Sequence, residues 1–425
     1  MIYLSILLKN GLVLYGSDYK LIRADILIDG NKIMEIKKNI NKSADTVIDA
    51  SNSLIIPAFV NSHTHSPMVI LRGLAEDVPL MEWLQNYIWP VERKLKAKDI
   101  YWGAKLALLE MAHSGISTFV DMYFHMEEVA KATLEVGLRG FLGYGMIDLG
   151  DEEKMKAEVK ETEKLYKFIS GLNSPLINFI LAPHAPYTCS LECLKWVAEK
   201  SKEWNSLITI HLSETKEEVR ITKEKYGQTP VEVLKTVGLL NERLIAAHGI
   251  WLTERDIDLL SSSGTTIVHC PASNMKLGSG IIRLRDLLDN GINVALGTDG
   301  AASNNTLDMI REMRLASLLQ KVHTLNPAII KSEEIFKMAT WNGAKALGLK
   351  AGLIEEGYLA DLAIINLKKP HLVPLNSPLS AILFSAKSGD VDTLIVNGKI
   401  IMLDGEVLTV DEEKVVDRFL GVNIE

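Results

Sequence analysis

The sequence has few cysteines and no long apolar run. Its 425 residues include three cysteines, which are too few for a disulfide framework and indicate a reducing compartment. No apolar stretch is long enough to cross a bilayer. The apolar N-terminal segment is interrupted at Lys9, Asn10 and Gly11. It lacks the basic start and the small-residue cleavage site of a signal peptide, so we interpret it as a strand. These absences predict a cytoplasmic protein with no membrane partner.

The sequence also lacks any block or stripe of basic residues. The formal net charge is −8, and charges of both signs are spread along the chain. This pattern argues against nucleic acid as a partner. With 47% hydrophobic and 24% charged residues, the composition is typical of a globular chain with a large core.

Short β-type runs occupy both chain ends, residues 1–56 and 352–425. Turn-forming dipeptides punctuate these runs: Gly30-Asn31, Asn397-Gly398 and Asp404-Gly405. Such pairs are typical of tight hairpin turns. Because chain ends often lie close together, we expect the two segments to form one small β-sandwich domain.

The middle of the chain, residues 57–351, alternates between β-type and helical stretches. We count eight apolar runs: IIPAFVNS, ISTFVDM, LRGFLGYG, LINFILAP, LITIHL, LIAAHG, TTIVHC and INVALGTD. Between most of them lie stretches with helical periodicity, such as DIYWGAKLALLEMAHSG. Strands that alternate with helices give a parallel sheet, and eight such units predict an α/β protein with a (β/α)8 TIM barrel.

Polar residues of a few types end most of the predicted strands. In such barrels the active site lies at the C-terminal ends of the strands. Six of the ten histidines stand there, whereas chance would scatter them. The strand-end residues, in chain order, are His63 with His65, Asp121, His184, His211, His248, His269 and Asp299.

Four of these residues form a possible metal site. His63 and His65 are two apart, so in an extended strand their rings point to the same side. With His211 and Asp299 they offer three nitrogens and one carboxylate, which suits Zn²⁺ and leaves a position for water. Fe²⁺ or another divalent ion would also fit. Taken alone, His211 is compatible with a buried histidine that bonds to the backbone, and Asp299 is compatible with a helix cap. The presence of all four residues together favours a metal site.

Several longer motifs resemble a known superfamily. PAFVNSHTH (57–65), ITIHLSET (208–215), AAHGIW (246–251) and LGTDGAAS (296–303) are similar to motifs of the amidohydrolase superfamily. A narrower likeness, to deaminases of 5′-methylthioadenosine and S-adenosylhomocysteine, including 5′-deoxyadenosine deaminase, rests on five further motifs. These are LRGLAED (71–77), MEWL (81–84), PVE (90–92), PHAPYTCS (183–190) and HCPASNMKLGSG (269–280).

The resemblance implies a zinc-dependent deaminase that converts the 6-amino group of a 5′-modified adenosine to a carbonyl and releases ammonia. Asp299 would ligate the metal and accept a proton from water, and His248 would orient or deprotonate that water. Glu214 would protonate N1 of the ring and later the leaving group. Alone, Glu214 suits a first-turn helix carboxylate. Binuclear relatives use a lysine at the end of strand four, and LINFILAPHAPYT has none there, which favours one metal per subunit.

The resemblance also indicates how the substrate binds. Glu92 and His184 match residues that hold the ribose hydroxyls, and Trp83 matches an aromatic near the base, although a core position suits Trp83 equally. Relatives acting on S-adenosylhomocysteine meet its carboxylate with arginine, but the matching stretch MIDLGDEEKMKAE contains only lysines. Arg139 and Arg72 are nearby in sequence, but neither aligns clearly with that position. The sequence therefore favours a neutral 5′ group, methylthio or deoxy, at least as much as homocysteine.

Some assignments stay open. His269 either touches the substrate or supports the pocket, and Asp121 either orients a metal-ligating histidine or has a structural role. Alternative functions are a guanine or cytosine deaminase, a triazine hydrolase, or a non-catalytic relative of the barrel. The cytidine-deaminase pattern, H-x-E with P-C-x-x-C, is missing. The resemblance further implies a homo-oligomer, for example a tetramer.

Overall fold

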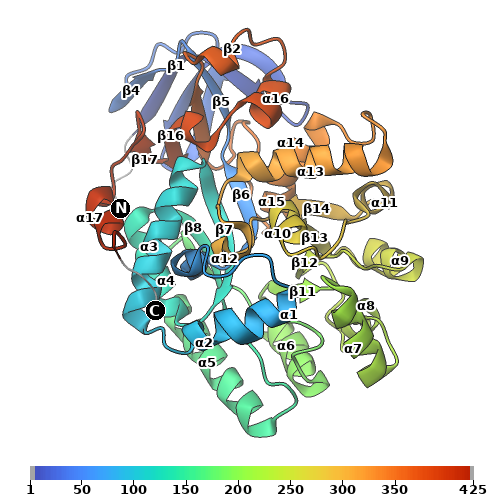
Figure 1. The fold of residues 1–425 in the computed structure, drawn as a ribbon. Coiled ribbons are helices and arrows are strands. Elements are labelled where there is room, and N and C mark those ends of the chain that lie inside the picture. The colour runs from blue at the N-terminus through green and yellow to red at the C-terminus, as the bar shows by residue number, and fades with distance from the viewer. Residues whose placement is uncertain (1–4, 422–425) are drawn as a thin grey trace.

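Strands from both chain ends join in one nine-stranded sheet (Figure 1). In the computed structural model, which describes residues 5–421, β5 pairs antiparallel with β15 and so connects the two ends. Residues 1–4 of the predicted N-terminal strand lie outside the described part. The strands are β1 (Ile6–Tyr15), β2 (Lys20–Asp29), β3 (Lys32–Lys37), β4 (Thr46–Asp49), β5 (Ser53–Pro57), β15 (Leu362–Asn366), β16 (Val391–Val396), β17 (Lys399–Leu403) and β18 (Glu406–Val407).

The predicted turns connect neighbouring strands of this sheet. Two residues separate the paired ends of β2 and β3, of β16 and β17, and of β17 and β18. Asn397 and Gly398 have φ values of 51° and 74°, the left-handed conformation that such hairpin turns require. Ile26, Ile55 and Ile364 meet in a shared apolar core. The prediction that the two chain ends join in one β structure is therefore confirmed, and it takes the form of a single nine-stranded sheet.

All eight predicted barrel strands are present, with β9 and β10 sharing the fourth position. Parallel pairing runs β6–β7–β8–β10, a bridge from Leu181 to Ile208 leads to β11, and pairing continues to β14. The Asp299 amide donates to the His63 carbonyl at 3.0 Å, where β14 approaches β6. The strands are β6 (Phe59–Thr64), β7 (Ile116–Tyr123), β8 (Arg139–Met146), β9 (Ile177–Phe179), β10 (Ala182–Pro183), β11 (Ile208–Leu212), β12 (Leu244–His248), β13 (Thr266–His269) and β14 (Asn293–Leu296).

Helices follow the barrel strands and surround them (Figure 1). Ser190, Thr215 and Thr253 begin three of these helices by accepting a backbone N–H three residues on, as N-caps do. The main barrel helices are α3 (Ala97–His113), α4 (Met126–Val136), α5 (Glu152–Gly171), α6 (Leu191–Glu203), α7 (Lys216–Tyr226), α8 (Pro230–Thr236), α9 (Glu254–Ser263), α11 (Leu284–Asp289), α13 (Met309–Thr324), α14 (Ser332–Ala339) and α15 (Trp341–Ala346).

Short helices fill the connections. Those at the mouth of the barrel are η1 (Ser66–Leu71), α1 (Leu80–Trp83), the π-helix η2 (Leu84–Ile88), α2 (Trp89–Glu92), α10 (Pro271–Lys276) and α12 (Ala301–Asn304). The C-terminal segment adds η3 (Pro370–Leu372), α16 (Pro378–Ser380), η4 (Ala381–Ser385), η5 (Ser388–Asp390) and α17 (Glu412–Asp417). No helix among residues 5–421 is both long and apolar enough to cross a membrane.

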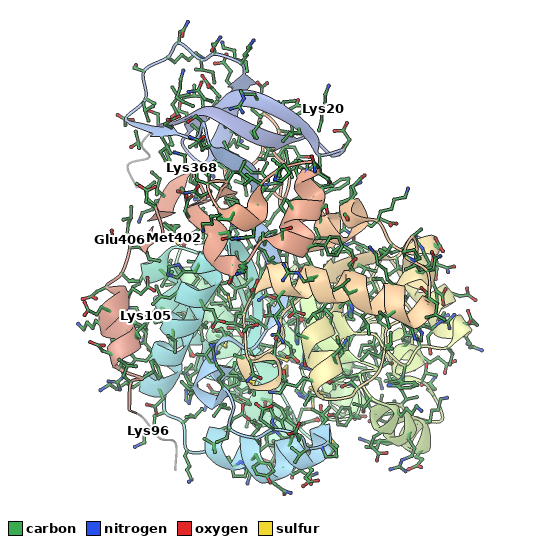
Figure 2. The ribbon with its side chains drawn as sticks, turned by 45° about the horizontal axis from the view of Figure 1, so that its top comes forward. Lys20, Lys96, Lys105, Lys368, Met402 and Glu406 are labelled. Atoms are coloured by element: carbon green, nitrogen blue, oxygen red, sulfur yellow. The ribbon has the colours of Figure 1, made fainter. Side chains whose placement is uncertain are left out.

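The chain-end sheet packs against the side of the barrel that carries α3. Figure 2 shows Met402 and Glu406 close to this helix, on which Lys105 lies. A fully buried ion pair also joins the two parts, because Arg139 at the start of β8 pairs with Asp361 just before β15. Asp361 accepts the Asn397 amide at 2.6 Å as well. The sheet is thus fixed to the N-terminal end of the barrel strands, away from their C-terminal ends.

Candidate metal centre and active site

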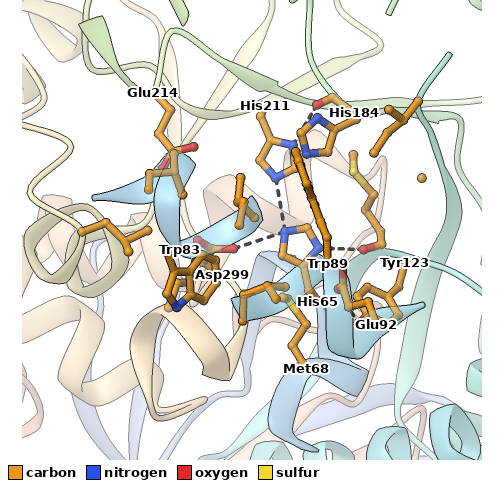
Figure 3. Close-up of a pocket in the computed structure, with 18 of the residues that line it drawn as sticks. His65, Met68, Trp83, Trp89, Glu92, Tyr123, His184, His211, Glu214 and Asp299 are labelled. Atoms are coloured by element: carbon orange, nitrogen blue, oxygen red, sulfur yellow. Dashed lines mark hydrogen bonds and ion pairs between the residues drawn. The ribbon is translucent and has the colours of Figure 1, made fainter. Parts of the chain in front are cut away.

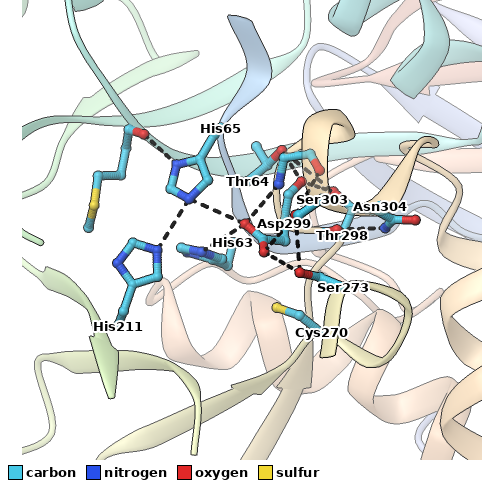
Figure 4. Close-up of polar contacts among 12 residues, drawn as sticks. His63, Thr64, His65, His211, Cys270, Ser273, Thr298, Asp299, Ser303 and Asn304 are labelled. Atoms are coloured by element: carbon cyan, nitrogen blue, oxygen red, sulfur yellow. Dashed lines mark hydrogen bonds and ion pairs between the residues drawn. The ribbon is translucent and has the colours of Figure 1, made fainter. Parts of the chain in front are cut away.

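The four predicted metal donors come together at the C-terminal ends of β6, β11 and β14 (Figure 4). His63, His65 and one carboxylate oxygen of Asp299 form a group whose ligand atoms lie within 4.8 Å of one another. His63, His211 and His248 form a second such group. The backbone is left-handed at His248 and Asp299, with φ of 74° and 59°. Conformations of this kind, rare for residues other than glycine, cluster at functional sites.

The hydrogen bonds of two rings define where their lone pairs point. His65 Nδ1 lies 2.6 Å from the Met122 carbonyl oxygen, and His211 Nδ1 lies 2.7 Å from that of His184. A carbonyl only accepts, so each Nδ1 donates. In the neutral rings the two Nε2 atoms then carry lone pairs, and they face each other at 3.2 Å. Asp299 Oδ1, another acceptor, is 3.3 Å from His65 Nε2. Converging acceptors need a cation, so this donor set fits a divalent metal.

His63 completes the donor set. Both of its ring nitrogens are buried without a hydrogen-bond partner in the part of the chain that the structure describes. Its Nε2 lies 3.7 Å from Asp299 Oδ1. A buried imidazole without hydrogen bonds carries a desolvation cost, which coordination to a metal would remove.

The charges of the site agree with a cation at its centre. Burial lowers the pKa of His65, but its hydrogen bond to Asp299 and the charge of that carboxylate outweigh burial and raise it to about 9. Burial raises the pKa of Asp299, yet His65 and the other rings hold it well below its usual range. Burial and the neighbouring rings hold the pKa of His63 and His211 well below the ordinary value. A positive charge is therefore favoured beside Asp299, and a metal ion can supply it in place of a proton.

Hydroxyl groups hold the Asp299 carboxylate in place (Figure 4). Ser273 and Ser303 donate to Oδ2 at 2.6 and 3.0 Å, and the Gly300 amide donates to Oδ1 at 2.8 Å. Ser273 lies in the HCPASNMKLGSG motif, but its spacing gave no sign of this contact. These bonds fix the side chain while leaving Oδ1 directed at the histidines.

Glu214 and His248 lie together at the same mouth. His248 Nε2 is 3.6 Å from Glu214 Oε2, and His248 Nδ1 is 2.9 Å from Asn274 Oδ1. Ser279 donates to Glu214 Oε1 at 3.2 Å. Burial raises the pKa of Glu214, which favours the protonated form that a general acid needs. Asn274 and Ser279 both come from the HCPASNMKLGSG motif, and neither was singled out in the sequence.

One pocket contains all of the predicted substrate contacts (Figure 3). Trp83 is buried in its wall, and Glu214 and Asp299 also line it. Glu92 accepts a hydrogen bond of 2.6 Å from the Tyr123 hydroxyl, and burial raises the pKa of Glu92. His184 Nδ1 lies 2.9 Å from the Thr188 hydroxyl. Tyr123, which ends β7, is a pocket residue that the sequence analysis missed.

Several residues considered in the sequence lie outside this pocket. Asp121 is bound by the Ser66 backbone amide at 3.0 Å and by the Ser66 hydroxyl. It therefore fixes the residue after His65, and no hydrogen bond joins it to a histidine within residues 5–421. His269 is buried, and neither of its ring nitrogens has a hydrogen-bond partner among the described residues. It ends β13 and is not among the residues that line the pocket.

The two arginines near the expected carboxylate site are engaged elsewhere. Arg139 is paired with Asp361 at the opposite end of the barrel, and Arg72 is paired with Glu110. Neither side chain lines the pocket.

Comparison with known proteins identifies the family. The model of the amidohydrolase family matches residues 54–401. The chain belongs to this family. A 5-methylthioadenosine/S-adenosylhomocysteine deaminase of Pyrococcus horikoshii is 75% identical over 99% of this chain and 100% of its own length. A 5′-deoxyadenosine deaminase of Methanocaldococcus jannaschii is 49% identical over 93% and 95%.

The fold is shared with solved structures of amidohydrolases. The crystal structure of a zinc-bound adenosine deaminase from Xanthomonas campestris superposes with a TM-score of 0.91 and 31% identity. It covers 97% of this chain and 96% of that one. The amidohydrolase assignment made from the motifs and the barrel fold predicted from the alternating strands and helices are therefore confirmed, and the protein is a hydrolase.

Proposed function

We propose that this amidohydrolase deaminates 5′-modified adenosines, such as 5′-deoxyadenosine, 5′-methylthioadenosine and S-adenosylhomocysteine, to the inosine analogue and ammonia. The observation that carries the proposal is the position of Glu214. Its largely buried carboxyl group lies 3.6 Å from His248 Nε2 and lines the same pocket as His65, His211 and Asp299. Glu92 and His184 also line this pocket. The names of the two relatives above support the same substrates.

Each site residue has a role in this reaction. A bound Zn²⁺ would polarise water and make it nucleophilic near neutral pH. Asp299 accepts the proton of the water that attacks C6, while His248, fixed by Asn274, orients that water. Glu214 donates a proton to N1. Glu214 then takes the proton of the new C6 hydroxyl and passes it to the exocyclic amine, so the C6–N bond breaks, ammonia leaves and a carbonyl remains at C6. The proton held by Asp299 restores the acid form of Glu214.

The ribose contacts distinguish a nucleoside from a free base. Glu92 is held by Tyr123 and faces the same pocket as His184. A carboxylate and an imidazole can together bind the 2′- and 3′-hydroxyls, which guanine, cytosine and triazines lack.

The non-catalytic alternative is disfavoured because all four metal donors are brought together. One zinc per subunit fits the strand-four end, where β10 is followed by His184 and no lysine. The homo-oligomer stays a prediction from the resemblance.

A substrate panel tests this proposal. Zinc-loaded protein is assayed with 5′-deoxyadenosine, 5′-methylthioadenosine, S-adenosylhomocysteine, adenosine, guanine and cytosine, by ultraviolet absorbance and ammonia release. Turnover of the 5′-modified adenosines supports the proposal, and turnover of free bases alone contradicts it.

A matched pair of variants tests the acid. Glu214→Gln is expected to keep its metal and lose deamination by about a hundredfold or more, as removal of a general acid does. Glu217→Gln, a first-turn carboxylate of α7 paired with Arg220 at the surface, is the control. Near-normal turnover by Glu214→Gln would remove Glu214 from the mechanism.

A further inference from the structure

A second cavity adjoins the substrate pocket and continues it outward. It has a volume of about 700 Å³, against about 100 Å³ for the pocket itself. The two cavities share five wall residues: Trp89, Glu92, Tyr123, Phe124 and Ile147. We call the second cavity the outer chamber. Its further walls come from residues 93–100, 125–127, 144–165 and 188.

Charged groups of both signs line the outer chamber, and two of its cationic side chains have no ion-pair partner among the described residues. Lys164 lies 2.9 Å from Glu127 and 3.3 Å from Glu161, so it is already paired with acids of the chamber wall. Arg93 and Lys154 also line the chamber. Neither has an ion-pair partner in the part of the chain that the structure describes. The chamber therefore has two cationic side chains, Arg93 and Lys154, that form no ion pair with its wall carboxylates Glu92, Glu127 and Glu161.

The position of Arg93 relates this charge to the substrate. Arg93 follows Glu92 directly, at the end of α2. Glu92 borders both cavities, whereas Arg93 borders only the outer one. If Glu92 binds the ribose hydroxyls, the adenine lies inward against Glu214 and Asp299. The 5′-carbon is at the other side of the ribose, so a long 5′ substituent extends into the outer chamber.

We propose that the outer chamber binds a 5′ substituent that ends in an amino-acid carboxylate, with Arg93 as the main carboxylate ligand and Lys154 as a second cation. This inference rests on the proposed function. Arg93 offers planar, paired N–H donors that match a carboxylate. The arginine that the sequence lacks in MIDLGDEEKMKAE is thus replaced by one from α2. Lys154, at the start of α5 within that stretch, faces the same chamber.

The test compares two substrates that differ only in the substituent. kcat/KM is measured for S-adenosylhomocysteine and for 5′-methylthioadenosine in the unmodified protein, Arg93→Gln and Lys154→Gln. Arg93 is exposed, so solvent screens part of its paired contact with a carboxylate, and Arg93→Gln is expected to lower the ratio of the two values about fivefold to tenfold. Lys154 is exposed, so Lys154→Gln is expected to lower the ratio by up to about fivefold. Lys156→Gln, two residues along α5 and paired with Glu152 and Glu153, is the control.

A third substrate isolates the carboxylate. In 5′-(3-aminopropylthio)-5′-deoxyadenosine the carboxylate is missing and the rest of the homocysteine chain is kept. Arg93→Gln is expected to have no selective effect on this compound. Equal losses on all three substrates would show that Arg93 merely supports α2 and would overturn the proposal, as would an unchanged ratio. If the unmodified protein deaminates none of them, the proposed function fails instead, so the two failures are distinguishable.

Discussion

Glu218 supplies a sharp test of how the proposed acid is positioned. This residue lies in the first turn of α7, is 3% exposed and lines the substrate pocket. Its two carboxylate oxygens accept the backbone amides of Ser213 at 2.9 Å and Glu214 at 2.6 Å. Ser213 is in the left-handed conformation, with φ of 50°. Glu218 therefore holds the strained turn that directs Glu214 into the pocket.

Glu218→Gln keeps the shape of the side chain but leaves only one of its two terminal atoms able to accept a hydrogen bond. The amide nitrogen of glutamine cannot accept, so one of the two backbone N–H groups faces a donor. Losing a hydrogen bond to a charged group costs about 1.5–3 kcal/mol. If the turn relaxes to relieve this contact, Glu214 is displaced from its productive position. We expect kcat to fall by roughly tenfold to a hundredfold, with KM nearly unchanged because the ribose contacts are intact.

The pH dependence separates positioning from simple loss of stability. Burial raises the pKa of Glu218 to about 7, and the two backbone amides oppose this rise. Above pH 7 the carboxylate accepts both amides, whereas below it the protonated group resembles glutamine. The ratio of wild-type to variant kcat is therefore expected to grow as the pH rises through about 7. Glu224→Gln, on the same helix and paired with Arg220, is the control. A ratio independent of pH, or a loss confined to metal content and melting temperature, would refute the positioning role.

Three further predictions concern the ribose, the metal and the contact between the two parts. Glu92→Gln is expected to raise KM for nucleosides about tenfold with a smaller change in kcat, and steady-state kinetics showing an unchanged KM would contradict it. Removal of the metal by a chelator should abolish turnover and lower the melting temperature in calorimetry, since a ligand of the folded state stabilises it. Zinc should restore both. Asp361→Asn leaves the buried Arg139 guanidinium without its carboxylate, which should destabilise the protein by about 3–5 kcal/mol in denaturant unfolding.

Much of the barrel and its metal donors could be predicted because both depend on local sequence. Each buried parallel strand is a short apolar run, and polar residues appear where it reaches the mouth. The closure of the barrel brings His63, which ends β6, to within 3.7 Å of Asp299, which follows β14. The site could therefore be predicted although its residues are far apart in the sequence.

The supporting contacts could not be predicted, because they depend on side-chain directions in the connections. The sequence places Asp121 at the end of its strand, but β7 continues to Tyr123, and Asp121 binds Ser66 instead of joining the donors. Arg139 is close in sequence to the expected carboxylate site, but it begins β8, so it lies at the far end of the same strand from the pocket. The walls of the outer chamber include segments of α2, β7, β8 and α5. The hydrophobic periodicity of one segment does not predict a cavity that several segments form together.

The site combines two kinds of support, and these have different consequences for substitution. The metal donors lie at strand ends, and backbone carbonyls of Met122 and His184 fix two of the rings. Trp83, Glu92 and Arg93 instead lie on short helical turns around the π-helix η2, in the connection between β6 and α3. Changes in this connection alter the walls that face the sugar and its substituent, but they leave the strand-end hydrogen bonds in place. Substrate preference can therefore change through α1 and α2 while the metal centre and Glu214 keep their geometry.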